Sequence, residues 1–435
     1  MRYHLWNIGC QMNQADAARL EEQLQGRGLR PAAKPEEAHL VIMNTCVVRQ
    51  SAENKVLGRL YSLRSWREMS QDRALVVMGC YVGDPEHLAT RFPWVDRFLA
   101  PSDLAGAIAF VDHWLAERKI SARSPFGGRQ SAICEMVPIS YGCDHYCTYC
   151  IVRLRRGPQA SRPLPDIVAQ ISDLVQRGAR EITLLGQNVD AYGTDLPGHP
   201  DLADILLAIH DLEGLWRIRF LTSHPSEMSQ RIIDVAAALP KVCEAWEVPV
   251  QSGDDSVLRR MGRGYTVARY LDLIERLRTA TPHCAISTDV IVGFPGETPQ
   301  QFENTVRLLE RVRFDIVHVA AYSPRPGMPA ANLPNDVPSK EKERRRQVIE
   351  ELQTAIAGEI NSRLLGEKPE VLVDGRQKGR WRGRTRTNKL VFFASQRDCL
   401  GNMARPTIVW TGPWSMIGEL DESRGSSLGP DGYER

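Results

Sequence analysis

Short apolar runs alternate with helix-like stretches along the first part of the chain. The apolar runs are typical of buried strands and lie at residues 3–8, 39–45 and 74–79. Helices are predicted to follow or intervene over residues 16–25, 51–66 and 85–92. Strands that alternate with helices in this way form parallel sheets. The pattern therefore predicts an N-terminal parallel α/β domain, which we place at residues 1–118.

The same alternation continues through the middle of the chain. Six strands are predicted there, over residues 137–141, 181–186, 216–222, 246–251, 286–293 and 315–322. Five helices are predicted between them, over residues 164–177, 202–213, 226–238, 266–279 and 298–312. This order of elements fits a partial (β/α)6 barrel, which we place at residues 129–360. Catalytic groups are expected at the C-terminal ends of its strands.

The last part of the chain has a different pattern. Residues 339–365 are rich in Lys, Glu, Arg and Gln, which predicts an exposed helix that links two domains. Beyond it, a small all-β domain is predicted at residues 364–424, with strands at 371–373, 389–393 and 406–410. Residues 425–435 are expected to form a flexible tail. The whole chain is thus expected to be a multidomain α/β protein.

Composition and the lengths of the apolar runs indicate the class of protein and its cellular compartment. Of the 435 residues, 43% are hydrophobic and 25% are charged, which excludes a wholly disordered chain, a collagen or a coiled coil. No apolar run reaches the roughly 18 residues of a membrane-spanning helix, and the N-terminus lacks the apolar core of a signal peptide. We expect a cytoplasmic protein with no membrane association. In that reducing compartment, the ten cysteines favour metal binding or catalysis over structural disulfides.

Three cysteines lie close together, at Cys143, Cys147 and Cys150. A zinc site usually takes four ligands in paired short spacings, and no fourth ligand has a matching spacing here. Three thiolates suit a [4Fe–4S] cluster with one iron left open to bind a substrate or cofactor. The C-x3-C-x2-C spacing followed by a β/α barrel is the signature of radical S-adenosylmethionine (SAM) enzymes. We therefore predict an iron–sulfur site at this triplet.

Three other cysteines are far apart in sequence but share a structural position. Cys10, Cys46 and Cys80 each follow one of the predicted N-terminal strands. The carboxyl ends of parallel strands meet at one edge of a sheet, where ligands commonly bind. The three thiolates are therefore expected to lie together and to hold a second cluster.

Polar residues gather at the predicted barrel strand ends. A turn or a helix cap would explain each of them singly, but their shared face favours a cofactor pocket. Two glycines of the Ile-Val-Gly-Phe-Pro-Gly-Glu segment, Gly293 and Gly296, are expected to let a ligand approach the backbone closely. The predicted pocket residues are Gly186, Gln187, Asn188, Ser223, Gln251, Asp289 and Gly293.

Basic residues are concentrated in two segments, although the net charge of the whole chain is only +2. The first directly follows the cysteine triplet and contains Arg153, Arg155 and Arg156. The second has seven Lys or Arg between residues 376 and 389, with a tryptophan among them. Basic side chains neutralise phosphates and an aromatic ring stacks on an unpaired base. The RNA-binding residues predicted in the second segment are Arg380, Trp381, Arg382, Arg384, Arg386 and Lys389.

With these pieces placed, nearly the whole chain resembles the radical SAM methylthiotransferases, and most of all the MiaB type that acts on tRNA. The motifs that carry the resemblance are Cys10-Gln11-Met12-Asn13, Asn44-Thr45-Cys46-Val47-Val48-Arg49, Leu185-Gly186-Gln187-Asn188-Val189, Thr222-Ser223-His224-Pro225, Pro249-Val250-Gln251-Ser252-Gly253, Ser323-Pro324-Arg325-Pro326-Gly327 and Gly383-Arg384-Thr385-Arg386-Thr387-Asn388. The resemblance implies an N-terminal three-cysteine domain, a radical SAM barrel and a C-terminal β domain of the TRAM type.

The resemblance also implies cofactors, a reaction and partners. Cys143, Cys147 and Cys150 would hold the [4Fe–4S] cluster that binds SAM. A second [4Fe–4S] cluster, which carries or donates sulfur, would be held by Cys10, Cys46 and Cys80. The substrate would be N6-isopentenyladenosine beside the anticodon, methylthiolated at carbon 2. Partners would be a tRNA anticodon stem-loop, a flavodoxin- or ferredoxin-like electron donor and an unidentified sulfur donor. The protein is expected to be a monomer.

Two other hypotheses remain open at this point. The same chemistry could modify threonylcarbamoyladenosine in tRNA or an aspartate of a ribosomal protein, as in the sister groups of the family. A non-catalytic iron–sulfur protein that binds or senses RNA is a third hypothesis, and it would not need a SAM pocket. The barrel motifs favour an enzyme. The Gln11-Met12-Asn13 motif and the basic C-terminal segment favour tRNA and the isopentenyl substrate.

Overall fold

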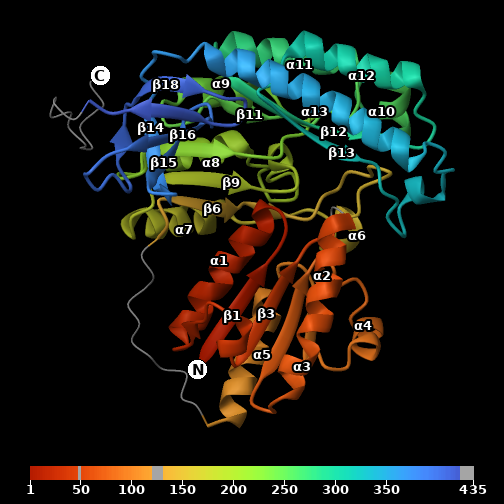
Figure 1. The fold of residues 1–435 in the computed structure, drawn as a ribbon, viewed down its shortest axis with the longest axis vertical. Coiled ribbons are helices and arrows are strands. Elements are labelled where there is room, and N and C mark those ends of the chain that lie inside the picture. Colours follow the sequence, from red (N-terminus) through yellow and green to blue (C-terminus); the bar gives the residue numbers. More distant parts are fainter. Residues whose placement is uncertain (48–49, 120–130, 422–435) are drawn as a thin grey trace.

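The structure is a computed structural model that describes residues 1–47, 50–119 and 131–421 (Figure 1). An N-terminal α/β domain lies below in this view, and a central region of strands and helices lies above it beside a C-terminal sheet. No helix within these described ranges has both the length and the apolar character needed to cross a membrane. The expected flexible tail at residues 425–435 lies outside the described residues.

The N-terminal domain is a five-stranded sheet in which every pairing is parallel. Its strands, in the order β2-β1-β3-β4-β5, are β2 (Arg30–Pro31), β1 (Arg2–Asn7), β3 (Leu40–Thr45), β4 (Ala74–Gly79) and β5 (Arg97–Leu99). Every residue of β3 and β4 is buried, because helices cover both faces. One face packs on α1 (Gln11–Gly26) and α5 (Leu104–Glu117), and the other on α2 (Gln50–Ser62), α3 (Arg64–Glu68) and α4 (Pro85–Arg91). The predicted α/β sheet is confirmed.

The central region has the six predicted parallel strands, in two three-stranded sheets of order β10-β9-β6 and β11-β12-β13. They are β6 (Cys134–Pro138), β9 (Glu181–Leu185), β10 (Arg217–Phe220), β11 (Ala245–Glu247), β12 (Ala285–Val292) and β13 (Ile316–Ala321). The predicted helices are α7 (Leu164–Gln176), α8 (Leu202–His210), α9 (Gln230–Ala238), α11 (Val267–Ala280) and α12 (Pro299–Val312). One apolar core joins both sheets. Two further helices, α6 (Val152–Arg156) and α10 (Asp255–Met261), were not predicted.

The charged helix α13 (Ser339–Ser362) contradicts the prediction of an exposed linker. It packs along β13 and buries Lys342, Arg345 and Gln353 together with apolar residues. The amide of Gln353 donates hydrogen bonds to the carbonyl oxygens of Phe314 and Asp315, at 3.1 and 3.0 Å. Polar side chains with fixed partners can therefore line a buried helix face, which is why composition alone misplaced this helix.

The C-terminal region is a mixed six-stranded sheet, consistent with the predicted all-β domain. Its strands are β14 (Val371–Gln377), β15 (Arg380–Thr385), β16 (Leu390–Ala394), β17 (Met403–Ala404), β18 (Thr407–Thr411) and β19 (Met416–Glu419). Strand β15 was not predicted, because its segment is rich in basic residues. Buried Trp381, Gly383 and Thr385 alternate in it with more exposed arginines. That alternation is the ordinary signal of a strand with one buried face.

The carboxyl edge of the N-terminal sheet faces the C-terminal ends of the barrel strands. Met12 and Ala15, in the first turns of α1, pack against Leu185 at the end of β9. Arg19, further along α1, donates a hydrogen bond to the hydroxyl of Tyr141 at 2.6 Å. The two predicted ligand-binding edges therefore meet at one domain interface.

Candidate functional site

The three scattered cysteines come together at the end of the N-terminal sheet, as predicted. The register pairs Thr45 with Gly79, so Cys46 and Cys80 leave neighbouring strands side by side, and Cys10 follows β1 next to them. A hydrogen bond with Cys46 lowers the pKa of the Cys10 thiol to about 6. None of these three cysteines forms a disulfide. This set of soft sulfur donors fits an iron–sulfur cluster.

Two glycines make this close approach possible. Gly9 and Gly79 have φ values of +146° and +102°, which glycine adopts far more readily than other residues. A Cβ on Gly9 would lie 2.6 Å from Cβ of Cys46, and a Cβ on Gly79 would lie 2.4 Å from the carbonyl oxygen of Thr45. Any larger residue at either position would push the strand ends apart.

A buried asparagine, Asn13, connects the same strand ends. Its amide nitrogen donates to the carbonyl oxygen of Thr45 at 2.9 Å and to Oδ1 of Asn44 at 3.2 Å. Asn44 returns a hydrogen bond from its own amide to the backbone oxygen of Asn13 at 2.8 Å. Oδ1 of Asn13 accepts from the thiol of Cys10 at 3.3 Å. We did not predict a role for Asn13, although it lies three residues after the first cysteine.

The tight triplet occupies the loop between β7 (Ser140–Tyr141) and α6. Thr148 fixes this loop to α10, because its backbone nitrogen donates to Met261 at 3.0 Å and its hydroxyl donates to Arg260 at 2.8 Å. The guanidinium of Arg263 lies 3.4 Å from the sulfur of Cys147. Burial raises the pKa of Cys150 to about 12, so a metal ligated by this sulfur would have to displace its proton.

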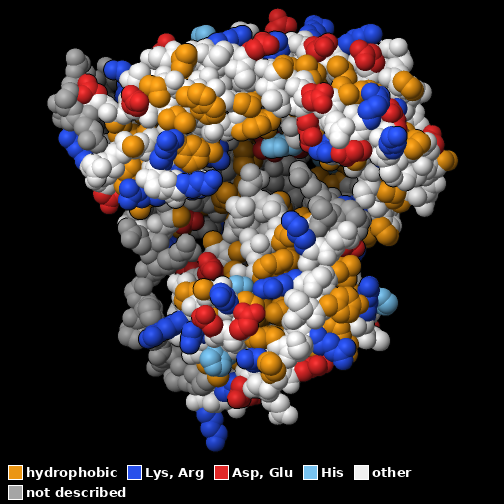
Figure 2. Space-filling view, viewed as in Figure 1, with side chains coloured by type: hydrophobic (Ala, Val, Ile, Leu, Met, Phe, Trp, Pro, Cys, Tyr) orange, Lys and Arg blue, Asp and Glu red, His pale blue; other side chains and the backbone are white. Residues whose placement is uncertain are grey.

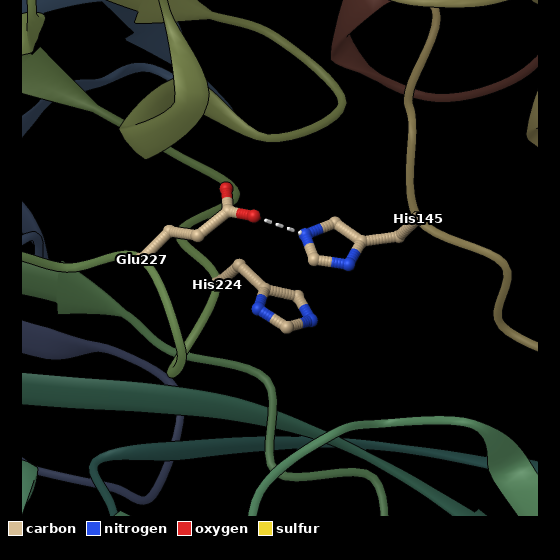
Figure 3. A group of neighbouring side chains, drawn as sticks. All are labelled: His145, His224 and Glu227. Atoms are coloured by element: carbon tan, nitrogen blue, oxygen red, sulfur yellow. Dashed lines mark ion pairs between the residues drawn. The ribbon is translucent and has the colours of Figure 1, made fainter. Parts of the chain in front are cut away.

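A histidine inside the triplet contacts the barrel strand ends (Figure 3). Nε2 of His145 lies 2.7 Å from a carboxylate oxygen of Glu227, and its ring stacks on His224 with centroids 3.9 Å apart. The other carboxylate oxygen of Glu227 accepts a hydrogen bond from the amide of Asn188. Burial, with Arg263 nearby, lowers the pKa of His224 to about 2, so its ring is neutral. We did not predict Glu227, which comes three residues after His224.

Six of the seven predicted pocket residues follow the C-terminal ends of barrel strands. Gly186, Gln187 and Asn188 follow β9, Ser223 follows β10, Gln251 follows β11, Gly293 follows β12, and Asp289 lies within β12. Asp190 is a further member, because its carboxylate accepts from Ser223 Oγ at 3.1 Å and from the backbone nitrogen of His224 at 2.8 Å. Burial raises the pKa of Asp190 to about 7. Donors and acceptors from different strands therefore converge on one face.

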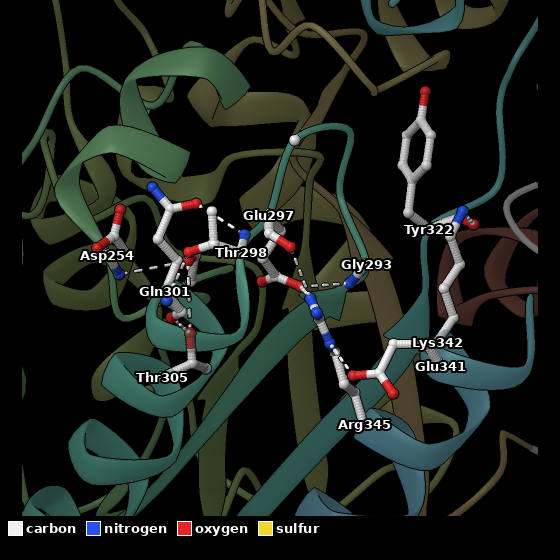
Figure 4. Close-up of polar contacts among 12 residues, drawn as sticks. Asp254, Gly293, Glu297, Thr298, Gln301, Thr305, Tyr322, Glu341, Lys342 and Arg345 are labelled. Atoms are coloured by element: carbon white, nitrogen blue, oxygen red, sulfur yellow. Dashed lines mark hydrogen bonds and ion pairs between the residues drawn. The ribbon is translucent and has the colours of Figure 1, made fainter. Parts of the chain in front are cut away.

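The loop after β12 is held by α13 (Figure 4). One carboxylate oxygen of Glu297 accepts from the backbone nitrogen of Gly293 at 2.6 Å and from Arg345 at 2.7 Å. A Cβ on Gly293 would lie 2.3 Å from Cγ of Lys342. Gly293 thus makes room for Lys342, and that lysine takes the close approach that we had predicted for a ligand. At Gly296, the nearest atom to such a Cβ is 3.8 Å away, on Arg260.

The arginines after the triplet have different surroundings. Arg153 pairs with Asp144 at 3.1 Å and lies over the exposed ring of Tyr146. Arg155 packs on Gly83, where a Cβ would lie 1.6 Å from its Nη1. The side chain of Arg156 is only 5% exposed and points into the N-terminal domain. The predicted phosphate contact is therefore wrong for Arg156, because RNA cannot reach its guanidinium.

The residues of the basic segment in the β domain also differ in their exposure and partners. On the face shown in Figure 2, Lys and Arg side chains gather over this sheet. Trp381 is only 5% exposed and its indole donates to Ser395 at 3.3 Å, so the prediction that it stacks on a base is wrong. Arg386 binds Glu244 at 2.7 Å, and Lys389 forms an ion pair with Asp315.

The remaining members of that segment are more accessible. Arg382 pairs with Asp374 at 2.8 Å, whereas Arg380 and Arg384 are exposed. Two buried arginines of β10, which we did not predict, hold the backbone of this segment: Arg217 donates to Arg384 at 2.7 Å, and Arg219 to Thr385 at 2.8 Å. The sequence did contain a sign of them, because two arginines occur in a segment that is otherwise typical of a buried strand.

Comparisons with known proteins agree with this geometry. Residues 137–309 match the Radical SAM superfamily, and residues 2–100 match Uncharacterized protein family UPF0004. The fold is similar to that of the radical S-adenosylmethionine methyltransferase TsrM from Kitasatospora setae, with a TM-score of 0.56 and 12% identity over 76% of this chain and 74% of that one. This likeness concerns the fold.

Two curated relatives span almost the whole chain. One, from Roseiflexus sp. (strain RS-1), is 48% identical over 97% of this chain and 90% of its own length. The other, from Chloroflexus aurantiacus, is 46% identical over 97% of this chain and 92% of its own length. Both carry the name tRNA-2-methylthio-N(6)-dimethylallyladenosine synthase. At this identity and coverage, the chain belongs to the family of radical SAM tRNA-2-methylthio-N(6)-dimethylallyladenosine synthases.

Proposed function

We propose that this chain transfers a methylthio group to carbon 2 of N6-dimethylallyladenosine in tRNA. The observation that carries the proposal is the meeting of two three-cysteine sites at one interface, each at the carboxyl edge of a parallel sheet. A sulfur-inserting enzyme needs a site that activates the substrate and a site that supplies sulfur. The family relatives are named for this same product.

The two cysteine sets have separate roles in this proposal. Cys143, Cys147 and Cys150 hold the radical SAM cluster, and Cys10, Cys46 and Cys80 hold the second [4Fe–4S] cluster. When bound, the first cluster and SAM supply the one-electron chemistry that an inert aromatic C–H bond requires. The reaction also needs a one-electron donor of the flavodoxin or ferredoxin class, a source of sulfur, and a second SAM that supplies the methyl group, so that two SAM are used per product. A tRNA substrate places the enzyme in the cytoplasm.

The residues around the barrel site hold it in shape and exclude water. Glu227 connects His145 of the cysteine loop to Asn188 at the end of β9. Met12 and Leu185 pack across the interface between the domains. Apolar contact of this kind keeps solvent away from a reactive site. Gly186, Gln187, Ser223 and Gln251 lie around the same face and are the groups available to orient SAM.

Substrate binding falls to exposed basic residues. Arg380 and Arg384 project from the β domain, and Arg153 lies beside the cysteine loop. Guanidinium groups at these places can neutralise phosphates of an anticodon stem-loop. The target base belongs to a loop, so its removal from the stack costs less than extraction from a duplex. Arg386 and Lys389 act indirectly, because they fix the β domain to the barrel.

Mass spectrometry of digested tRNA nucleosides tests the proposal. A host that lacks its own methylthiotransferase is compared with the same host expressing this chain or its Cys147→Ala variant. We expect 2-methylthio-N6-dimethylallyladenosine only with the unchanged chain. If the nucleoside stays unmodified although the protein is soluble and holds iron, the substrate assignment fails. Modified threonylcarbamoyladenosine or a modified ribosomal aspartate would then identify a sister activity.

A second readout separates an enzyme from an RNA-binding sensor. The reconstituted protein is incubated anaerobically with SAM and a reductant, and 5′-deoxyadenosine is quantified. An enzyme of this class releases it, and the Cys147→Ala variant does not. A protein that holds its cluster but releases none would be a sensor.

A further inference from the structure

One side chain of the barrel domain enters the N-terminal cysteine site. Arg156 is the last residue of α6, six positions after Cys150. Its Nη1 donates to the hydroxyl of Ser102 at 2.8 Å, and its Nη2 donates to Oδ1 of Asn13 at 3.2 Å. Only 5% of the side chain is exposed. The guanidinium is thus buried and fixed by two residues of the other domain.

The same guanidinium lies against the cysteines of that site. Its positive charge interacts electrostatically with the sulfurs of Cys80 and Cys10. Asn13 accepts from the Cys10 thiol and from Arg156 through one oxygen atom. Arg156 therefore belongs to the surroundings of the Cys10 and Cys80 sulfurs, although in the sequence it follows the other cysteine triplet.

The positive charge of Arg156 is only partly balanced by protein carboxylates. Asp16, itself 1% exposed, lies 3.8 Å from Nη1, and its Oδ2 accepts from Ser102 at 2.8 Å. That separation is longer than a direct hydrogen bond. A buried cation needs a close anionic partner, and three cysteine thiolates beside it supply negative charge once they ligate iron.

The charge of Arg156 determines the direction in which it shifts the reduction potential of the cluster. Three thiolates outweigh the charge of an oxidised four-iron core, so the assembled site is anionic, and its reduction adds further negative charge. The potentials of iron–sulfur sites depend on net charge, burial and hydrogen bonds to the sulfurs. A buried guanidinium stabilises the more negative state in a medium of low dielectric constant. It therefore raises the reduction potential.

We infer that Arg156 is a positioning residue that stabilises the reduced form of the cluster at Cys10, Cys46 and Cys80. The inference rests on the proposed second cluster. The residue also joins the two sites physically, because α6 begins two residues after Cys150 and its last residue contacts Ser102 and Asn13 of the N-terminal domain. Its role differs from that of an RNA contact, which its sequence context had indicated.

A potential titration of the full-length protein tests this inference. The parent protein carries Cys143→Ala, Cys147→Ala and Cys150→Ala, so that only the N-terminal site can hold a cluster. The fraction of reduced cluster is followed by electron paramagnetic resonance. In the added Arg156→Gln variant, we expect the reduced-to-oxidised ratio at a fixed potential to fall about tenfold, a shift of about 59 mV for one electron.

Two further variants control for charge and position. Arg153→Gln removes a nearby arginine that pairs with Asp144 instead, and it should titrate like the parent. Arg156→Lys keeps the charge and should load iron and titrate within about threefold of the parent. If Arg156→Gln loads iron and titrates like the parent, the inference is overturned. If the Arg156→Gln variant does not load iron, the Arg156→Lys variant decides. A tenfold fall in its reduced-to-oxidised ratio at a fixed potential overturns the inference, whereas a ratio like that of the parent supports it.

Failure of the proposed function has a different signature. A parent protein that binds no cluster at the N-terminal site shows this in its iron content, before any titration. That result overturns the second-cluster assignment and this inference with it. A loaded parent with an unchanged Arg156→Gln potential overturns only the role of Arg156.

Discussion

The two cysteine sites offer the same three thiols but are built in different ways. Cys143, Cys147 and Cys150 lie within eight residues of one loop, whereas Cys10, Cys46 and Cys80 are separated by 36 and 34 residues. The loop site depends on local backbone and on a few contacts to α10. The sheet site exists only when three strands pair in register and two glycines allow their ends to approach. Its formation therefore depends on the fold of a whole domain.

The largest expected effect comes from removing each cysteine set in turn. Replacing Cys143, Cys147 and Cys150 by Ala should abolish both 5′-deoxyadenosine and the methylthio product. Replacing Cys10, Cys46 and Cys80 by Ala should preserve 5′-deoxyadenosine release and abolish the product. We expect the product losses to exceed the roughly 100-fold that loss of an outer-shell partner costs a metal site.

Iron content provides the control for this comparison. Each triple variant should keep half of the iron of the unchanged protein, because each retains one complete cysteine set. If the N-terminal variant also stops releasing 5′-deoxyadenosine while it keeps its barrel iron, the two sites do not have separate roles.

A smaller effect is expected where tRNA binding is weakened without touching either cysteine site. Arg380 and Arg384 are exposed, so Arg380→Gln with Arg384→Gln should weaken tRNA binding roughly tenfold. The slope of log Kd against log salt concentration should fall by about 1 per arginine. Filter binding at several salt concentrations measures both quantities.

Arg386→Gln is the matched control, because Arg386 binds Glu244 and the carbonyl oxygen of Val242 at the domain interface. It should lower the thermal midpoint of the protein and leave the salt slope unchanged. Iron content and 5′-deoxyadenosine release should stay constant in the Arg380 and Arg384 variant. An unchanged tRNA affinity in that variant would remove these two residues from the proposed interface.

The sequence allowed the sheet site to be predicted because regular strands carry it. Apolar runs before Cys10, Cys46 and Cys80 fixed their places in a parallel sheet, and parallel pairing fixed their proximity. The barrel face was predictable for the same reason. In both cases a local pattern and a general rule of topology were sufficient.

Buried charge was not predictable in the same way. Arg156, Lys342 and Arg345 occur in segments whose composition indicates solvent exposure, yet each is buried with partners distant in sequence. Trp381 lies among arginines but packs in the core of the β domain. The burial of such residues depends on which element packs against them, and one sequence does not contain that information in a local form.

The smallest expected effect is a change in the pH dependence of stability. It follows from a comparison of two buried carboxylates, one in the N-terminal domain and one in the barrel. Asp16, beside the sheet site, has Arg156 nearby, whereas the interactions of Asp190 in the barrel are hydrogen bonds from Ser223 and His224. Burial raises the pKa of Asp190 from 3.8 to about 7. Between pH 3.8 and about 7, Asp190 is therefore protonated in the folded protein and ionised in the unfolded chain.

The sign of the pH dependence follows from this proton. Where the unfolded state binds fewer protons, the free energy of unfolding falls as pH rises, by at most about 1.4 kcal/mol per pH unit for one group. The contribution of Asp190 is thus largest at low pH, is lost as pH rises towards 7, and is constant above that. Burial also raises the pKa of Glu247 to about 7, so two carboxyls of the barrel act in the same direction.

Thermal unfolding of the metal-free protein between pH 5.5 and 7.5 measures this effect against Asp190→Asn. An asparagine can accept from the backbone nitrogen of His224 and donate to Ser223, as a protonated carboxyl does, but it does not titrate. The midpoint of the unchanged protein should fall more steeply with pH, by about 2 °C per pH unit relative to the variant. Glu247 contributes equally to both proteins and cancels in the difference. Parallel midpoint curves would mean that Asp190 is ionised throughout this range, and that hydrogen bonds alone suffice to hold a buried carboxylate at the barrel face.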